Sequence, residues 1–271
     1  MTKTIQVLGI GNAIVDIIAM VSEAFLAEHG GTKSSMSLIS AEQASLLYGQ
    51  TPQAEEHSGG SAANTMAGLA GLGGGGAFVG KVKNDQLGAI FRHDIVAASV
   101  TFETAPSNEG PDTASSIVLV TPDGERTMHT HLGACVNLTE ADIAPDMVRA
   151  AEVLYIEGYV WDLESSKKAI MKAISIAKDS NTQVALTLSD SFCVRRFREE
   201  FLTLISDHAD MVFANVDELA ALYPGVTQAD ALALLRARVP IAAITRGNKG
   251  AMVLAGDETL ITPAETVTVV D

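Results

Sequence analysis

The second half of the sequence alternates short, continuous apolar runs with segments of helical periodicity. The apolar runs are Val153–Glu157, Val184–Leu188, Met211–Ala214 and Ile241–Thr245, and a further run, Ile5–Gly11, lies near the N-terminus. The segments with helical periodicity are Glu164–Lys178, Arg195–Ser206, Val216–Tyr223 and Gln228–Ala237. Strands buried on both faces have continuous apolar sequences, and helices connect parallel strands. The pattern therefore predicts an α/β fold whose mostly parallel central sheet is covered by helices on both faces and binds ligands at the carboxyl ends of its strands.

Two stretches, roughly residues 12–40 and 99–132, interrupt this alternation with β-prone sequence. In the second stretch, Thr113–Val120 and Arg126–Leu132 flank Pro122-Asp123-Gly124, and Asp-Gly between two such runs is a strong hairpin signal. The sequence has no internal repeat or low-complexity linker. We therefore expect one α/β domain over residues 1–271, with the strands of a small β-sheet inserted in it.

Charge and composition restrict the kinds of molecule that this chain is expected to bind. The sequence has 18 Lys and Arg against 33 Asp and Glu, a net charge of −15. A chain this acidic is repelled by phosphate backbones and anionic lipids, so neither nucleic acid nor a membrane is an expected partner. No apolar run is long enough to span a bilayer and the N-terminus has no features of a signal peptide, so we expect a cytoplasmic protein. The two cysteines, Cys135 and Cys193, are predicted to be buried thiols.

Two glycine patterns suggest nucleotide-binding loops that the local order excludes. The G-x-G-x-x-G pattern of Gly71, Gly73 and Gly76 ends a predicted helix and precedes the predicted strand Ala77–Gly80. A dinucleotide fingerprint requires the reverse order, so a Rossmann oxidoreductase is not expected. The near match to a P-loop before Val82 fails as well, because Ser or Thr must stand there to bind Mg²⁺.

The segment Ser58-Gly59-Gly60-Ser61-Ala62-Ala63-Asn64-Thr65 runs into a predicted helix. Paired glycines let the backbone approach a ligand closely, and a helix N-terminus directs amide donors towards it. Asn64 adds a donor and an acceptor that suit vicinal hydroxyls. A plain glycine-rich helix start is the alternative interpretation of this segment.

The order of three motifs is more specific. Asp16 follows the first strand and Gly9-Ile10-Gly11-Asn12, the segment Gly59–Thr65 reads GGSAANT, and Phe78–Gly88 reads FVGKVKNDQLG. This order resembles the PfkB (ribokinase-like) family of carbohydrate and nucleoside kinases over essentially the whole chain. Ser61 and the Asn64-Thr65 pair are more similar to the adenosine kinase branch. The resemblance implies a three-layer sandwich with a small β-sheet lid.

The resemblance also assigns roles on the acceptor side. It implies that Asp16 accepts hydrogen bonds from substrate hydroxyls, assisted by Gly59, Gly60 and Asn64. The hairpin Thr113–His131 corresponds to the family's lid, in which Arg126 is the candidate catalytic cation that reaches the transferring phosphate. Glu157 and Tyr159, at the end of a buried strand, are implied to contact the substrate. The alternatives are that Asp16 is only a turn carboxylate, that Arg126 is an exposed arginine of the hairpin, and that Tyr159 only packs at the edge of the sheet.

Two further motifs correspond to the nucleotide side of the family. Asn215-Val216-Asp217-Glu218 has the form of a helix capping box. The resemblance implies that Asn215 and Glu218 belong to the Mg²⁺–phosphate network, with Glu218 acting through metal-bound water. It also implies that Thr245 and Gly247, in Thr245-Arg246-Gly247-Asn248-Lys249-Gly250, hold the phosphates of ATP. Ordinary capping and turn chemistry remain alternatives.

The last predicted strand, Val267–Val270, leads to Asp271. In the family this Asp begins the motif D-T-[TN]-G-A-G-D, whose final Asp is the general base. We therefore expect that base six residues after Asp271 and no useful kinase activity in the 271-residue chain. Asp271 itself corresponds to a position that often helps to bind a monovalent cation such as K⁺.

The sequence as a whole predicts an ATP- and Mg²⁺-dependent phosphotransferase that acts on a hydroxyl of a nucleoside, with adenosine favoured, or of a sugar. A ribose, fructose or keto-deoxy sugar acid kinase is the first alternative. The second is a non-catalytic relative that binds a sugar or nucleoside. A homodimer formed through the lid is also left open.

Overall fold

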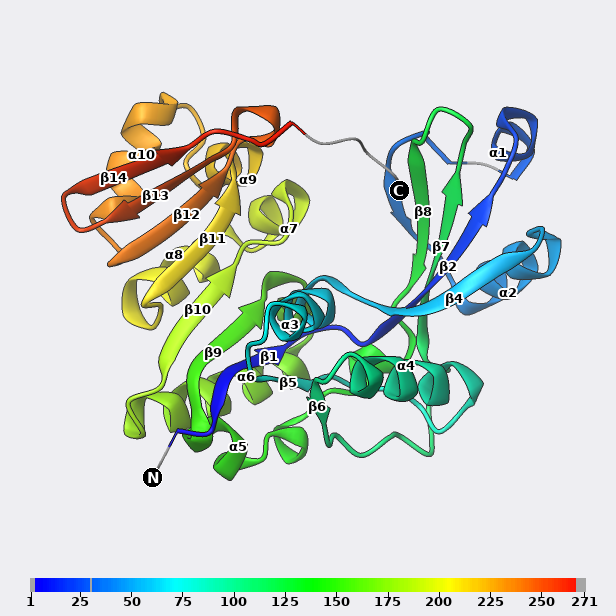
Figure 1. Cartoon of the computed structure of the whole chain (residues 1–271), viewed down its shortest axis with the longest axis horizontal. Helices are drawn as coiled ribbons and strands as arrows, with labels where there is room; N and C mark the ends of the chain where they lie inside the picture. The colour runs from blue at the N-terminus through cyan, green and yellow to red at the C-terminus, as the bar shows by residue number, and fades with distance from the viewer. Residues whose placement is uncertain (1–2, 30, 267–271) are drawn as a thin grey trace. The chain divides into compact units, whose positions relative to one another are not determined.

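The computed structural model describes residues 3–29 and 31–266 and divides into two compact units (Figure 1). The first unit contains the described residues up to 10 and from 143 onwards, and the second contains residues 11–142. The predicted strand Val267–Val270 and the candidate cation ligand Asp271 lie outside the described residues.

The first unit is built on a sheet whose strands follow the order β14-β13-β12-β11-β10-β9-β1. Their bounds are β1 Ile5–Ile10, β9 Ala151–Glu157, β10 Gln183–Thr187, β11 Met211–Asn215, β12 Ile241–Thr245, β13 Ala251–Ala255 and β14 Glu258–Thr262. The strands from β1 to β12 are parallel to their neighbours, and β13 and β14 add an antiparallel edge. The mostly parallel sheet that the apolar runs predicted is therefore confirmed.

Short helices connect these strands. Their bounds are α5 Pro145–Ala150, η3 Gly158–Asp162, α6 Glu164–Asp179, α7 Ser191–Arg196, α8 Arg198–Asp207, α9 Val216–Leu222, α10 Gln228–Arg236 and η4 Gly247–Lys249. The prediction of one helix over Arg195–Ser206 was wrong. A first helix already begins after Asp190, whose carboxylate accepts a hydrogen bond from the Cys193 N–H at 2.6 Å. The chain leaves helical geometry at Phe197, with φ −115° and ψ 25°, and a second helix follows.

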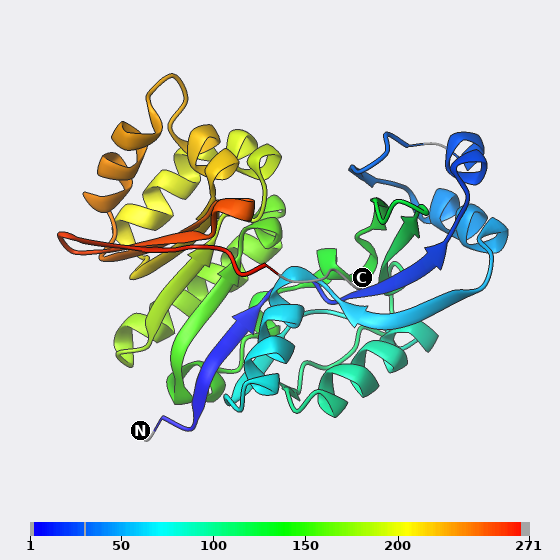
Figure 2. The same ribbon diagram turned by 45° about the horizontal axis from the view of Figure 1, so that its top comes forward.

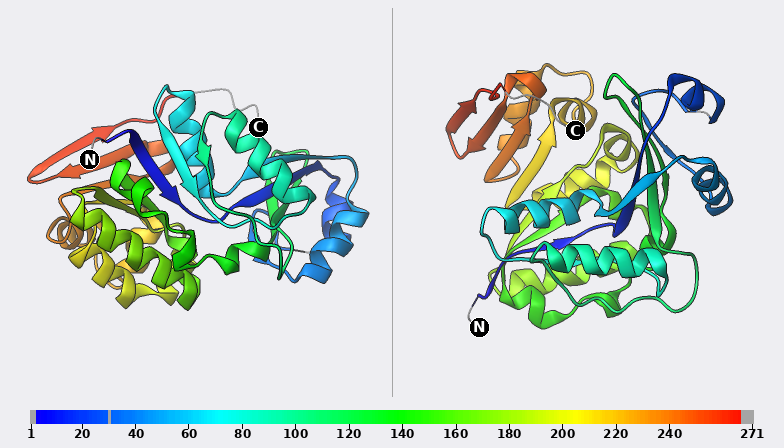
Figure 3. Two further views of the ribbon diagram at one scale, coloured as in Figure 1. Left: turned by 90° about the horizontal axis from the view of Figure 1, so that it is seen from below. Right: turned by 45° about the vertical axis from the view of Figure 1, so that its right-hand side comes forward.

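The two faces of this sheet are equally buried at β10, where Val184, Ala185 and Leu186 are all buried, but not at β11 and β12. In β11, Val212 and Ala214 are buried, whereas Met211 is half-buried and Phe213 is exposed. The same alternation is present in β12. Figure 3 shows the helices of this unit gathered on one side of its strands. The predicted cover of both faces therefore holds at β10 and is reduced at β11 and β12. A continuous apolar run does not reveal this difference, because it does not show which of its side chains pack against helices.

The second unit contains a five-stranded lid sheet in the order β3-β8-β7-β2-β4. Its strands are β2 Ile14–Met20, β3 Met36–Leu38, β4 Ala54–Gly59, β7 Ala114–Val120 and β8 Arg126–His131. The predicted hairpin of β7 and β8 is confirmed, with Gly124 at φ +82° and its N–H donating to the Thr121 carbonyl. β2 was not predicted as a strand of its own, and β4 lies outside both stretches that were expected to supply lid strands.

The remaining elements of this unit lie outside the lid sheet, and β5 and β6 pair with each other rather than with its strands (Figure 2). They are α1 Glu23–His29, α2 Ala41–Gln50, α3 Ser61–Gly71, β5 Gly76–Val79, α4 Gln86–Ala97, β6 Thr101–Phe102, η1 Gly133–Asn137 and η2 Glu140–Asp142. Phe78, Phe91 and Phe102 form a buried aromatic cluster that joins β5, α4 and β6. Gly71 ends α3, Gly73 follows this helix and Gly76 begins β5. The glycines thus end a helix and precede a strand, as predicted, which is the wrong order for a dinucleotide fingerprint.

Two expectations from composition can be checked directly. Cys135 and Cys193 are both buried and unbridged, as predicted. Within residues 3–29 and 31–266, every helix is too short or too polar to cross a bilayer.

Candidate active site

Asp16 lies in the interior of β2, between His57 of β4 and Ser116 of β7. Burial raises the pKa of its carboxyl group to about 6, and the positive charges of Arg126 and His57 oppose this shift only in part. A carboxylate with such a pKa is ionised at neutral pH but is poorly solvated. It can therefore gain considerable stabilisation from hydroxyl donors on a ligand.

The backbone of Gly59 and Gly60 lies beside the Asp16 carboxylate. Gly59 ends β4, and a Cβ placed there would overlap the Asp16 carboxylate. Gly60 has φ +94°, and a Cβ there would overlap the Asn12 carbonyl oxygen. The structure thus brings Asp16, Gly59 and Gly60 together, and only glycine fits both backbone positions. Asn64 follows in the first turn of α3, with its N–H donating to the Gly60 carbonyl at 2.9 Å and its side chain exposed.

Arg126 is the first residue of β8 and is exposed. It pairs with Val120, which pairs in turn with Met20 of β2. Residues that are directly paired across strands point to the same face of a sheet, and so do residues two apart in one strand. Arg126 therefore lies on the same face of the lid sheet as Asp16.

The same face carries a group of exposed apolar side chains that sequence reasoning missed. Ile18 and Met20 follow Asp16 at alternate positions and are 39% and 67% exposed. Met36 and Leu38 of β3 join this face through their pairing with Met128 and Thr130. Met36 is 41% exposed and Leu38 is 56% exposed. The alternation of Asp16, Ile18 and Met20 would have revealed this face if β2 had been recognised.

In the first unit, Asn215 and Glu218 form the predicted capping box at the start of α9. The Asn215 side-chain oxygen accepts the N–H of Glu218 at 2.8 Å. In return, the Glu218 carboxylate accepts the Asn215 N–H at 3.0 Å and its side-chain N–H at 2.6 Å. Glu218 is only 4% exposed, and burial raises the pKa of its carboxyl group. The local interpretation of this motif is confirmed.

Thr245 is the neighbour of Asn215, because the two residues pair at the carboxyl ends of β12 and β11. Thr245 is exposed, and Gly247 begins η4 with φ +57°. Three of the four residues predicted for the nucleotide side, Asn215, Glu218 and Thr245, thus lie together. Gly247 lies two residues beyond Thr245 at the same edge of the sheet.

Glu157 ends β9 and is 1% exposed, whereas Tyr159 lies in η3 and is half-buried. The Tyr159 hydroxyl donates to the Ser189 carbonyl at 3.4 Å, and the Tyr159 N–H donates to Ser189 Oγ at 3.3 Å. Burial raises the pKa of the Tyr159 hydroxyl, and the negative charges of Asp190 and Glu157 raise it further. Tyr159 is therefore a neutral, hydrogen-bonded side chain.

Ser189 and Asp190 follow β10 and were missed by sequence reasoning. Ser189 has φ +72°, a strained conformation for a residue with a side chain. The charge of Asp190 also contributes to the raised pKa of Glu218. Ser-Asp-Ser directly after a predicted strand is a helix N-cap signal, and it could have placed Asp190 at the carboxyl edge of the sheet.

The donors at this edge are compatible with Mg²⁺ held by few protein groups. Both carboxylate oxygens of Glu218 already accept a hydrogen bond from Asn215, so they have limited capacity for a direct metal bond but can accept from metal-bound water. In the described part of the chain, no three His, Cys, Asp or Glu side chains gather as a metal site. This donor set fits a metal that keeps most of its water ligands.

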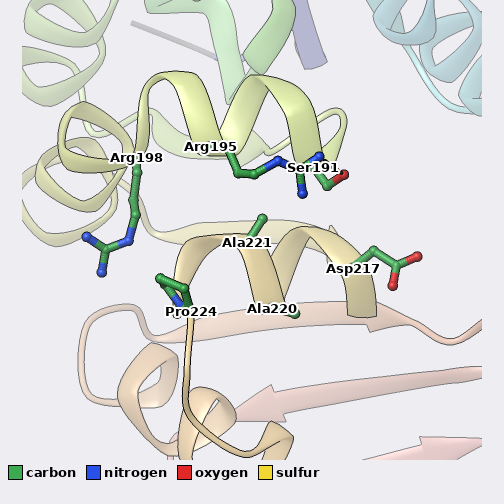
Figure 4. Close-up of a pocket in the computed structure, with 7 residues that line it drawn as sticks. All are labelled: Ser191, Arg195, Arg198, Asp217, Ala220, Ala221 and Pro224. Carbon is green, nitrogen blue, oxygen red and sulfur yellow. Dashed lines mark hydrogen bonds between the residues drawn. The ribbon is translucent and has the colours of Figure 1, made fainter.

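A pocket of about 620 Å³ lies between α7 and α9 (Figure 4). Ser191 and Arg195 form one wall, and Asp217 and Ala220 form the other. None of the predicted site residues lines it. The Arg195 guanidinium donates to Ser191 Oγ at 3.1 Å, so these two residues of one wall are hydrogen-bonded to each other.

Comparison with known proteins shows to which family this chain belongs. Residues 33–271 match the family described as pfkB family carbohydrate kinase. The chain belongs to the pfkB family. Among solved structures, the adenosine kinase of Sinorhizobium meliloti is 48% identical with a TM-score of 0.92, over 98% of this chain and 82% of that chain. The predicted ribokinase-like α/β fold with a small lid sheet is therefore confirmed for this pfkB member.

Characterised pfkB relatives act on different acceptors. Fructokinase-2 of Solanum lycopersicum is 28% identical over 204 residues, which are 71% of this chain and 61% of that protein. Guanosine-inosine kinase of Escherichia coli is 27% identical over 232 residues, which are 82% of this chain and 53% of that protein. The chain thus spans little more than half the length of these curated relatives.

Proposed function

We propose that this protein is an ATP- and Mg²⁺-dependent phosphotransferase that phosphorylates a hydroxyl of a nucleoside, with adenosine as the favoured acceptor. The proposal rests on family membership together with the composition of the lid face. The adenosine kinase of Sinorhizobium meliloti is a relative at 48% identity, which agrees with this acceptor.

The observation that carries the choice of acceptor is the neighbourhood of Asp16. One strand presents a half-buried carboxylate and, on the same face, the exposed apolar side chains of Ile18 and Met20. A nucleoside has a diol that can donate to a carboxylate and a base with two apolar faces that can cover apolar side chains. A free sugar has less apolar surface than a nucleobase and would cover less of these side chains.

The polar groups at the carboxyl edge of the other sheet support the nucleotide half of the proposal. We assign Thr245 and Gly247 to the phosphates of ATP, and Asn215 and Glu218 to the water ligands of Mg²⁺. Bound Mg²⁺–ATP supplies the electrophilic phosphoryl group. Phosphoryl transfer depends mainly on positioning and charge stabilisation, so these residues need no unusual reactivity.

On the acceptor side, we assign Asp16, Gly59, Gly60 and Asn64 to orienting the acceptor. Glu157 and Tyr159 are assigned to its outer contacts. Arg126, which is exposed on the lid face, would bring positive charge to the transferring group when acceptor and lid come together. An apolar lid face over the acceptor would exclude water, which otherwise competes for the phosphoryl group.

The test is a kinase assay on the product of the complete reading frame, with Mg²⁺–ATP and separately adenosine, ribose, fructose and a keto-deoxy sugar acid. We expect the highest kcat/KM with adenosine. Ile18→Ser should raise the KM for adenosine about tenfold and leave the KM for ATP unchanged. Met171→Ser, which changes a side chain of similar exposure on α6, is the matched control. Undiminished turnover by Asp16→Asn would refute the acceptor-site assignment.

The same assay can distinguish two alternative functions from a nucleoside kinase. A preference for fructose or ribose would make the protein a sugar kinase, in agreement with its fructokinase relatives. Adenosine binding by calorimetry without turnover would favour a non-catalytic nucleoside-binding protein. A homodimer through the lid also remains a proposal, and a concentration-dependent mass in sedimentation that Met36→Ser abolishes would support it.

A further inference from the structure

We infer that Asp85 and Asp94 of α4 are positioning residues that anchor the two lid strands on either side of the strand that carries Asp16. Asp85 is the N-cap of α4, and Asp94 lies in its last turn. The effect on acceptor binding rests on the proposed function, whereas the anchoring itself is a property of the second unit alone.

Asp85 does more than cap a helix. One of its oxygens, Oδ1, accepts the Gly88 N–H at 2.8 Å, which is the ordinary capping bond. The same oxygen accepts the Thr113 hydroxyl at 2.6 Å, and Oδ2 accepts the Thr113 N–H at 2.9 Å. Thr113 is 1% exposed and directly precedes β7. The carboxylate therefore holds the first residue before a lid strand by two charge-assisted bonds in a buried setting.

The backbone around the contact between Asp85 and Thr113 is closely packed. The Lys83 N–H donates to Thr113 Oγ1 at 2.9 Å, and its ammonium group pairs with Asp112 at 2.9 Å. A Cβ at Gly88 would overlap the Lys83 carbonyl oxygen and would lie 3.0 Å from Thr113 Oγ1. The segment before α4 and the segment before β7 are thus joined by several bonds at one point.

Asp94 holds the other side of the lid. Its Oδ2 accepts the N–H of Ser58 at 3.1 Å. Ser58 belongs to β4, pairs with Val15 of β2 and directly precedes Gly59. One helix therefore binds both strands that flank β2, because the sheet order is β7-β2-β4. Figure 1 shows α4 crossing at the base of these strands.

The two anchors determine the position of the Asp16 carboxylate. Asp16 pairs with Ser116 of β7 and His57 of β4. Ser116 is three residues from Thr113 in the sequence, and His57 directly precedes Ser58. If either anchor is lost, that strand can shift and carry the Asp16 carboxylate away from Gly59. Asp85 and Asp94 would then influence acceptor binding without touching the acceptor.

The test that needs no substrate is hydrogen exchange measured by mass spectrometry on the 271-residue chain. Thr113→Val removes the hydroxyl but leaves the α4 cap intact, and Asp94→Asn weakens the second anchor. We expect about tenfold faster exchange in residues 114–120 for the first variant and in 54–59 for the second. Strands β9 to β11 should be unchanged, and Thr113→Ser should restore the native rate. Thr203→Val, which removes a hydroxyl from an exposed local bond in α8, is the control.

Unchanged exchange in the lid strands, or equal acceleration in both units, would overturn the inference. A second arm uses the product of the complete reading frame. Thr113→Val should raise the KM for the acceptor about tenfold and leave kcat and the KM for ATP within about twofold. A general loss of stability would instead lower the concentration of active enzyme, and would therefore lower the apparent kcat with both substrates. If exchange responds as expected but no acceptor is phosphorylated, the anchors stand and the proposed function fails.

Discussion

The Asp16 carboxylate lies against the backbone of Gly59, with no space between them for a side chain. Gly59→Ala should therefore displace the carboxylate and weaken adenosine binding at least tenfold, because the acceptor's hydroxyls lose an aligned charged partner. Isothermal titration calorimetry measures this loss. Gly68→Ala is the matched control, because a Cβ at Gly68 in α3 would meet nothing within 4 Å. Equal affinities of the Gly59 variant and this control would contradict the prediction.

Acceptor binding should depend on pH through Asp16. Its pKa is raised from 3.8 to about 6 by burial, so the carboxylate that accepts hydrogen bonds is lost as pH falls through about 6. We expect the affinity for adenosine to fall between pH 7 and pH 5. The same titration of Asp16→Asn should give a weak and flat profile. A wild-type profile without a transition in this range would refute the role of Asp16.

The same pKa shift predicts that Asp16 destabilises the fold at neutral pH. The folded state holds the proton more tightly than the unfolded state, so stability falls as pH rises from about 3.8 to about 6. Asp16→Asn should therefore increase the free energy of unfolding by about 2–3 kcal/mol at pH 7 and by little at pH 4. Urea unfolding across this range measures the difference. Asp257→Asn, which changes an exposed carboxylate in a turn, is the matched control.

Glu218→Gln tests the nucleotide side. The backbone N–H and the side-chain N–H of Asn215 would then face an amide, whose single oxygen cannot replace both carboxylate acceptors. We expect turnover by the complete enzyme to fall about a hundredfold, with a higher Mg²⁺ requirement and an unchanged affinity for the acceptor. Asp217→Asn, the exposed neighbour in the same helix turn, is the control. A fall of equal size in both variants would point to the loss of negative charge in the first turn of α9 rather than to the metal network.

Phe91 should be a major contributor to the stability of the second unit. It is fully buried, and its ring lies 5.9 Å from that of Phe78 and 5.3 Å from that of Phe102. Phe91→Ala should cost about 3–5 kcal/mol of unfolding free energy. Leu72→Ala, at a position that is 91% exposed, should cost less than about 0.5 kcal/mol. Chemical denaturation of both variants checks this contrast.

Sequence reasoning succeeded where the physical signal was local. The strands β9 to β12 were visible because each is a short apolar run, and helical periodicity follows the first three of these runs. The capping box of Asn215 and Glu218 was visible because its partners are three residues apart. The break at Phe197 was missed, because the helical periodicity of its neighbours continues across it while the N-cap at Asp190 begins a separate helix.

The parts that escaped prediction depend on partners far apart in the sequence. β4 reads Ala-Glu-Glu-His-Ser-Gly, which has little β-propensity, and it is a strand because β2 pairs with it. The contact between Asp16 and Gly59 was implied only by family resemblance, since no local pattern links positions 43 residues apart. The exposed apolar lid face became visible only when the register of β2, β3 and β8 was known.

The central lid strands have a consequence for biosynthesis. β2 pairs in parallel with β7, so the strand that bears Asp16 must wait for about a hundred later residues before its second edge is covered. A nascent chain on the ribosome therefore exposes an open, apolar strand edge for several seconds at ordinary elongation rates. Chaperones that bind extended apolar segments should recognise this intermediate, and release should coincide with emergence of the β7–β8 hairpin from the exit tunnel.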